Sequence, residues 1–193
     1  MIGAYASFHL IDLIRHPWTT NEVQGYTPHR TSLWSQLYGR ANSAHFDYWP
    51  PSWQTANRAV HWLTRMIFVC ALLPAGLLII GAAGRVSMWI RNFRNREWPF
   101  FADTAMLLDL AAAIGLAFII AYTMRYRDFS TMKAQFLYPA LAGYIALFVH
   151  GCTMVSAGRF GTSRIMAGLY GVCGAVCVFY CADIATLVVH LAR

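Results

Sequence analysis

The sequence predicts an all-α, polytopic membrane protein with about four transmembrane helices, preceded by an aromatic-rich extramembrane segment. Of its 193 residues, 58% are hydrophobic and only 12% are charged, whereas about 25% of residues are charged in an ordinary soluble domain. A bilayer core about 30 Å thick needs about 20 apolar residues per helix, and windows of this kind recur after residue 60. These two observations predict one membrane domain.

Residues 1–60 precede the apolar windows, and we expect them to form an extracytoplasmic or interfacial segment. Residues 1–16 can form a short helix that Pro17 ends, although it is too short and too polar to span a bilayer. Aromatic residues then alternate with polar ones: Trp18, Trp34, Tyr38, Trp49 and Trp53. Indole and phenol rings in such surroundings are typical of the membrane–water boundary.

Residues 61–193 are expected to form the transmembrane domain. Its four apolar stretches cover about residues 63–84, 102–124, 134–156 and 165–191. Pro74 lies inside the first stretch and is expected to kink it.

The distribution of Lys and Arg predicts the orientation of the four helices. The expected loops at 85–97 and 157–164 together hold six basic residues, and the loop at 125–133 holds three. Basic loops favour the cytoplasm, so we expect the 125–133 loop, the N-terminal segment and the C-terminus to lie outside. Arg15, Arg30, Arg40 and Arg58 count against this orientation, but a long segment contributes weakly to the rule. The expected location is a bacterial inner (plasma) membrane.

The formal net charge of +7 does not indicate nucleic-acid binding. The Arg residues lie mostly at the ends of apolar runs, where they anchor helices and meet anionic lipid headgroups. We therefore expect membrane lipids as partners, and no nucleic acid.

Acidic residues inside the apolar stretches need a partner, a proton or water, because burying a carboxylate in hydrocarbon costs several kcal/mol. Asp103 lies near a helix end, where we expect it to act as an N-terminal cap. Asp109 and Asp183 lie deeper. A hydrogen bond or ion pair between helices is the expected role for both, with a proton or ion pathway as the alternative.

Histidines in the apolar stretches raise the alternative of a haem-binding or proton-relaying subunit. Haem between helices needs two imidazoles at matching depth. His61 and His190 meet this condition only near the membrane surface, and His150 lies inside the third stretch. We expect hydrogen-bonded or interfacial histidines, and no cofactor.

Three cysteines recur every four residues in the fourth stretch: Cys173, Cys177 and Cys181. Thiols on one lipid-immersed stripe lack a metal-binding geometry, so no metal site is expected. With glycines beside them, they predict a face for close helix packing.

The loop before the third stretch gathers three cations, Arg125, Arg127 and Lys133, within about nine residues. A guanidinium can bind phosphate through two hydrogen bonds, and an ammonium supplies a point charge. The loop is therefore a candidate site for a lipid phosphate. Ordinary anchoring at the interface is the alternative.

The run from residue 126 to residue 140 resembles a loop of polytopic glycosyltransferases related to protein O-mannosyltransferases and to the aminoarabinose transferase of lipid A. Phe129-Ser130, Lys133, Phe136 and Pro139 match the pattern of that loop. Phe136 stands where the family has Tyr, and Leu137-Tyr138 departs from its order. Residues 28–38 and 45–50 are similar to the external loop that precedes the last helices of bacterial members.

The resemblance implies a polyprenyl-phosphate-linked sugar as donor, with its phosphate bound at the extracytoplasmic surface by Lys133 and by Arg125 or Arg127. The acidic catalytic loop of the family has no counterpart in this sequence. We therefore expect the C-terminal portion of such an enzyme, with no catalytic residue of its own. It would act with a missing N-terminal part or with a partner membrane subunit. The alternative is a small non-catalytic membrane subunit of a larger complex.

Overall fold

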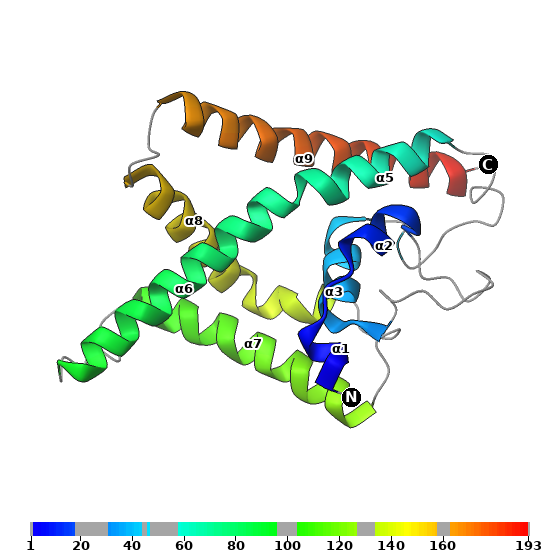
Figure 1. Ribbon diagram of the computed structural model, residues 1–193. Coiled ribbons are helices and arrows are strands. Elements are labelled where there is room, and N and C mark those ends of the chain that lie inside the picture. Colours follow the sequence, from blue (N-terminus) through cyan, green and yellow to red (C-terminus); the bar gives the residue numbers. More distant parts are fainter. Residues whose placement is uncertain are drawn as a thin grey trace. The chain divides into compact units, whose positions relative to one another are not determined.

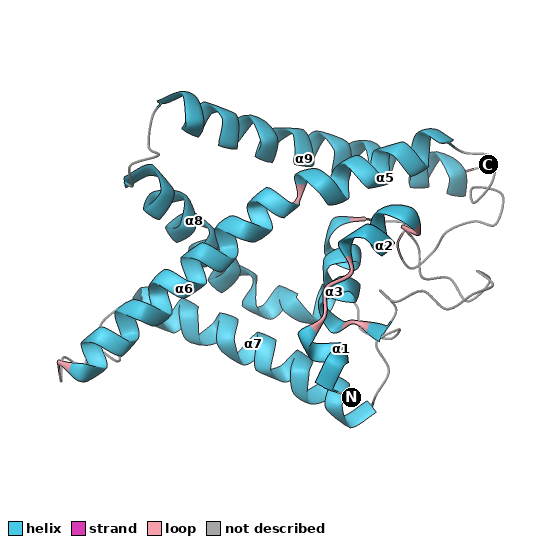
Figure 2. Ribbon diagram, in the orientation of Figure 1, coloured by secondary structure: helices cyan, strands magenta, loops and turns pink. Residues whose placement is uncertain are grey.

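The structure is a computed structural model in which every element of the described residues is helical (Figures 1 and 2). The described residues are 2–17, 31–43, 46, 58–95, 104–126, 134–157 and 163–192. Four helical stretches are long and apolar enough to cross a membrane: Ala59–Arg94, Thr104–Arg125, Leu137–Ala157 and Ser163–His190. The prediction of an all-α membrane protein with four transmembrane helices is confirmed.

The first helical stretch is longer than the predicted 63–84. It consists of α5 (Arg58–Cys70) and α6 (Leu72–Arg94). Arginine is a good helix former, so α6 continues past the apolar window through the basic residues that follow it. The expectation of a loop beginning at Arg85 was therefore wrong, since that residue lies within the helix.

The interruption between α5 and α6 agrees with the expected effect of Pro74. Ala71 is a turn residue between the two helices. Pro74 has no N–H to donate to the carbonyl of Cys70, and its ring crowds that carbonyl. The helical hydrogen bonding is therefore broken one turn before the proline.

The chain divides into two compact units. The first unit comprises Met1–Ala71, Tyr126–Ala134 and Cys173–Arg193, and the second comprises Leu72–Arg125 and Gln135–Val172. The proposed boundary at residue 60 concerns the position of the bilayer, and it stays a prediction.

The first unit contains three short helices from the N-terminal segment: α1 (Ile2–Ala6), α2 (Leu10–Arg15) and α3 (Leu33–Asn42). The helices α2 and α3 contact α5, and α1 contacts α3. Leu13, Phe46 and Phe68 are fully buried together, and Tyr38 packs against them. The hydroxyl of Tyr38 donates to the carbonyl of Phe68 at 2.5 Å. The single helix expected over residues 1–16 is thus two helices, with a break at residues 7–9.

Polar side chains fix the N-terminal helices to one another. The hydroxyl of Ser32 donates to the carbonyl of Ser7 at 2.5 Å, and the indole of Trp34 donates to the carbonyl of Tyr5 at 2.6 Å. Ser32 also caps α3 by accepting from the amide of Ser35. These bonds satisfy backbone carbonyls that the short helices leave open.

The second unit contains α6, α7 (Thr104–Tyr126), η2 (Ala134–Ala140), α8 (Leu141–Ala157) and the first part of α9 (Ser163–Leu191). In Figure 1, α6 crosses α8. Glycines allow this contact, because a Cβ on Gly81 would overlap the carbonyl of Leu147, and one on Gly151 would overlap the carbonyl of Leu77. Small residues bring membrane helices into close contact in this way.

The third predicted stretch, 134–156, does not begin as an α-helix. Its first seven residues form the 3₁₀ helix η2, which contains Pro139. Proline removes one α-helical hydrogen bond and crowds the carbonyl of Gln135. The α-helix α8 therefore begins only at Leu141.

Candidate functional site

The cationic loop predicted to bind phosphate lies largely outside the described residues, because Arg127 and Lys133 both fall there. Arg125 is described: it is exposed and lies in the last turn of α7. The loop joins the end of α7 at Tyr126 to the start of η2 at Ala134. The assignment of the three cations to a phosphate site stays a prediction.

The described residues contain a buried ion pair between two transmembrane helices. Nε of Arg85 on α6 donates to Oδ2 of Asp109 on α7 at 2.5 Å. The side chains are only 13% and 7% exposed, respectively. The expectation that Asp109 makes a contact between helices is confirmed, and its partner is Arg85.

The ion pair fixes α6 against α7. A carboxylate or guanidinium alone in hydrocarbon is costly, and the pair cancels both charges at once. The guanidinium of Arg85 also lies 4.0 Å from the sulfur of Met88, one turn further along α6. Sequence reasoning missed Arg85 because it counted that residue in a loop. The available signal was an intramembrane acid, Asp109, with a basic residue at the end of the preceding apolar stretch.

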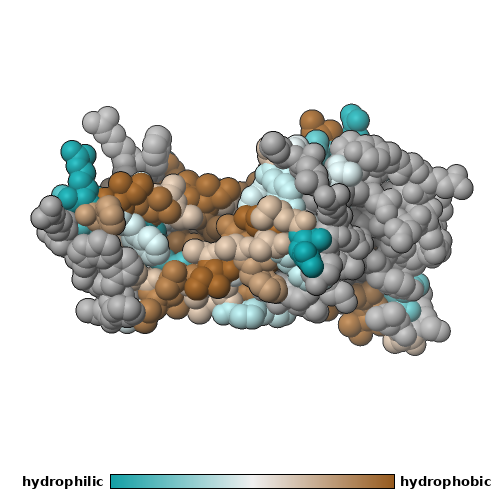
Figure 3. Space-filling view, turned by 90° about the horizontal axis from the view of Figure 1, so that it is seen from below, coloured by the Kyte–Doolittle hydropathy of each residue, from teal (hydrophilic) through white to brown (hydrophobic). Residues whose placement is uncertain are grey.

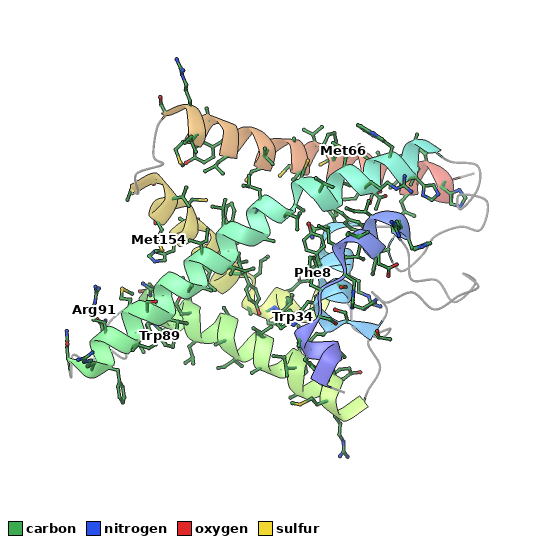
Figure 4. The ribbon with its side chains drawn as sticks, in the orientation of Figure 1. Phe8, Trp34, Met66, Trp89, Arg91 and Met154 are labelled. Atoms are coloured by element: carbon green, nitrogen blue, oxygen red, sulfur yellow. The ribbon has the colours of Figure 1, made fainter. Side chains whose placement is uncertain are left out.

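The second unit also has an open groove of about 400 Å³ between α6 and α8. The groove lining comprises Ile80, Ala83, Gly84, Ser87, Met88, Arg91 and Met154. Figure 4 labels Arg91 on α6 and Met154 on α8. The walls of the groove are mostly apolar, and Arg91 is the cationic side chain among its lining residues.

Gly84, which lines the groove, also lies close to side chains of α8. A Cβ there would overlap the sulfur of Met154 and would lie 3.2 Å from Nε2 of His150. His150, one of the predicted candidates, is therefore a half-buried neighbour of Gly84. The described residues hold no cluster of three or more His, Cys, Asp or Glu side chains that could bind a metal ion.

Three further candidates, Asp183, His61 and His190, belong to the first unit. Asp183 is fully buried on α9, and its carbonyl accepts from the hydroxyl of Thr186 at 2.7 Å. His61 on α5 and His190 on α9 are half-buried. The rings of Trp62 and Phe179 bring α5 and α9 together, with centroids 6.3 Å apart. Asp103, predicted to be a helix cap, lies outside the described residues.

Part of the predicted close-packing face on α9 is open among the described residues. Cys177 and Cys181 are exposed, and a Cβ on Gly171 or Gly174 would meet no described atom within 4 Å. Exposed apolar residues such as Val178 give α9 the surface of a helix in contact with lipid. Packing of another membrane helix on this face stays a prediction. On the face drawn in Figure 3, apolar residues cover much of the surface of the described residues.

Comparison of the chain with protein-family models, with curated proteins and with solved structures finds no match. The residues of this chain alone carry the functional inference.

Proposed function

We propose that the chain is the C-terminal membrane portion of a glycosyltransferase that uses a polyprenyl-phosphate-linked sugar at the extracytoplasmic face of a bacterial plasma membrane. One observation carries the proposal: the sequence from the last turn of α7 into η2 combines three cations with the Phe129-Ser130, Lys133 and Pro139 pattern. This loop connects the ends of two transmembrane helices.

The proposed role of the cations is to hold the phosphate of the lipid donor. A lipid phosphodiester carries one negative charge, and its charge grows when the sugar leaves. Lys133 supplies a compact point charge, and an arginine can bind two phosphate oxygens at once. Cations near that phosphate stabilise the charge that develops on the leaving group.

In this proposal the chain binds the lipid donor, and none of its residues is assigned as the catalytic base. A hydroxyl of the acceptor must lose its proton when it attacks the sugar, and the acidic residues for this step would come from another segment or subunit. We expect the chain alone to bind the lipid donor without transferring its sugar.

Photocrosslinking to a diazirine-bearing polyprenyl phosphate tests the proposal. Labelling should fall about tenfold in Lys133→Ala, since one charge-assisted phosphate contact contributes on the order of 1–2 kcal/mol. The matched control is Arg164→Ala, because Arg164 is an exposed cation at the start of α9 in the loop expected on the opposite side. Equal labelling of wild type and Lys133→Ala would refute the assignment.

A second candidate function is that of a non-catalytic subunit, which the open surface of α9 favours. The glycines at the start of this helix would accommodate larger side chains without meeting described atoms. A partner helix can approach closely at such positions. Co-purification of a larger membrane protein that Gly171→Leu abolishes, together with unchanged polyprenyl-phosphate labelling in Lys133→Ala, would favour this function over the first.

A further inference from the structure

We propose that the groove between α6 and α8 binds one anionic phospholipid, with an acyl chain along the groove and the phosphate at Arg91. The proposal does not depend on the glycosyltransferase assignment. It concerns the opposite ends of the transmembrane helices from the loop at 125–133.

The shape of the groove follows from the helix contact. The glycines Gly81 and Gly151 bring α6 and α8 together. Beyond that contact lies the open groove of about 400 Å³, lined from Ile80 on one side to Met154 on the other. Such a volume lies within the range of about 300–1,000 Å³ that small ligands occupy.

The lining residues on α6 extend over about the thickness of one leaflet of a bilayer. Ile80 and Arg91 lie about 16 Å apart along α6, at about 1.5 Å per residue. Half of a hydrocarbon core about 30 Å thick is about 15 Å. Trp89 and Arg91, in the last turns of α6, are the residue types that favour the headgroup region. An acyl chain lying beside Ile80 would therefore place its phosphate at the level of Arg91.

The chemistry of the lining selects an anionic amphiphile. Ile80, Ala83, Met88 and Met154 present hydrocarbon and thioether surface, and methionine adapts to irregular apolar ligands. The hydroxyl of Ser87 donates to the carbonyl of Ala83 at 2.8 Å. The hydroxyl proton of Ser87 is therefore already bonded within α6, and the wall of the groove is largely apolar.

Charge at one end of the groove distinguishes an anionic lipid from a partner helix. Arg91 is exposed at the end of the groove, and a guanidinium binds a phosphodiester through paired hydrogen bonds. A transmembrane partner helix carries no phosphodiester for this cation to bind, whereas a phospholipid carries one.

Native mass spectrometry of the full chain, incubated with equal amounts of phosphatidylglycerol and phosphatidylcholine, tests the proposal. We expect one phosphatidylglycerol to be retained about fivefold more than phosphatidylcholine, and Arg91→Gln to remove this preference. Arg94→Gln is the matched control, because Arg94 is an exposed cation in the same last turn that does not line the groove. The Arg94→Gln variant should keep the preference of the wild type for phosphatidylglycerol.

A second pair of variants tests the position of the acyl chain. Ala83→Trp should fill the groove and reduce retention of both lipids about fivefold. Ile79→Trp places the same side chain at an exposed position of α6 outside the lining, and retention should not change. Three results would each overturn the proposal: equal retention of both lipids by the wild type, an equal effect of Arg91→Gln and Arg94→Gln, or undiminished retention in Ala83→Trp.

Discussion

The guanidinium of Arg85 on α6 bonds the carboxylate of Asp109 on α7 at 2.5 Å, and both side chains are nearly buried. The pair turns two groups that hydrocarbon would reject into a specific contact between helices. It also explains why α7, whose exposed residues are mostly apolar, tolerates an acid inside its apolar stretch.

Removing one member of this pair should strongly destabilise the second unit. Asp109→Leu leaves the guanidinium of Arg85 buried beside apolar side chains, which costs about 3–5 kcal/mol of unfolding free energy. The double variant Arg85→Met/Asp109→Leu removes both charges, and we expect it to recover most of that loss. Unfolding in mixed micelles measures both values. A double variant no more stable than Asp109→Leu would contradict this account.

The contact between α6 and α8 should depend on its glycines. Gly151→Leu forces side-chain atoms against the carbonyl of Leu77, so the helices must separate, and we expect a loss of at least about 1–3 kcal/mol. Gly168→Leu is the control, because a Cβ there meets no described atom within 4 Å. The same unfolding assay compares the two variants. Equal losses would show that the packing at Gly151 has no special importance.

The stability of the first unit should fall at alkaline pH because of Tyr38. Burial, with a smaller effect of Cys70, raises the pKa of the Tyr38 phenol above the unfolded value of about 10. The folded state therefore holds this proton more tightly. The stabilisation is complete below about pH 10 and is lost as the pH rises from there toward the folded pKa.

Tyr38→Phe isolates this effect from the other tyrosines. The variant loses the hydrogen bond to the carbonyl of Phe68, which costs about 1 kcal/mol near neutral pH. The difference in stability between wild type and Tyr38→Phe should shrink between about pH 8 and about pH 11. Denaturant unfolding at both pH values measures it, and a constant difference would disprove the titration of Tyr38.

The contact between Trp34 on α3 and Tyr5 on α1 should stabilise the N-terminal helices, and a conservative substitution can remove it. The indole N–H of Trp34 donates to the carbonyl of Tyr5 at 2.6 Å. Trp34→Phe keeps an aromatic ring but leaves that carbonyl without the donor, so protease cleavage near α1 should become several-fold faster. Trp62→Phe, in the same unit, is the control. Equal cleavage rates in the two variants would contradict the role of the Trp34 contact.

Composition was sufficient to predict the fold class, because few charges and long apolar windows leave only transmembrane helices as a stable solution. It could not set the end of α6. Arg91 and Arg94 are compatible with both a helix and an interfacial loop, and helix propensity extended the helix. The effect of Pro74 was predictable because it is a local property of the backbone.

For the polar residues inside the apolar stretches, the sequence predicted the type of partner but not which residue it is. Asp109 required a counterion, but its identity depends on how α6 and α7 approach each other, which local sequence does not encode. The burial of Ser32 and Ser35 likewise follows from bonds to residues about 25 positions away. The cysteine pattern on α9 suggested packing because small residues suit it, yet the same residues are compatible with lipid.

The proposed phosphate site requires the 125–133 loop to lie at the extracytoplasmic surface of the membrane, and labelling of this loop from outside the cell tests that requirement. The variant Ser130→Cys is made in a chain whose five native cysteines are replaced by alanine. The new thiol is then treated in intact cells with a membrane-impermeant maleimide. We expect labelling without permeabilisation, because the phosphate site is proposed at the extracytoplasmic surface. Labelling only after the membrane is opened would place the loop in the cytoplasm and contradict the proposed function.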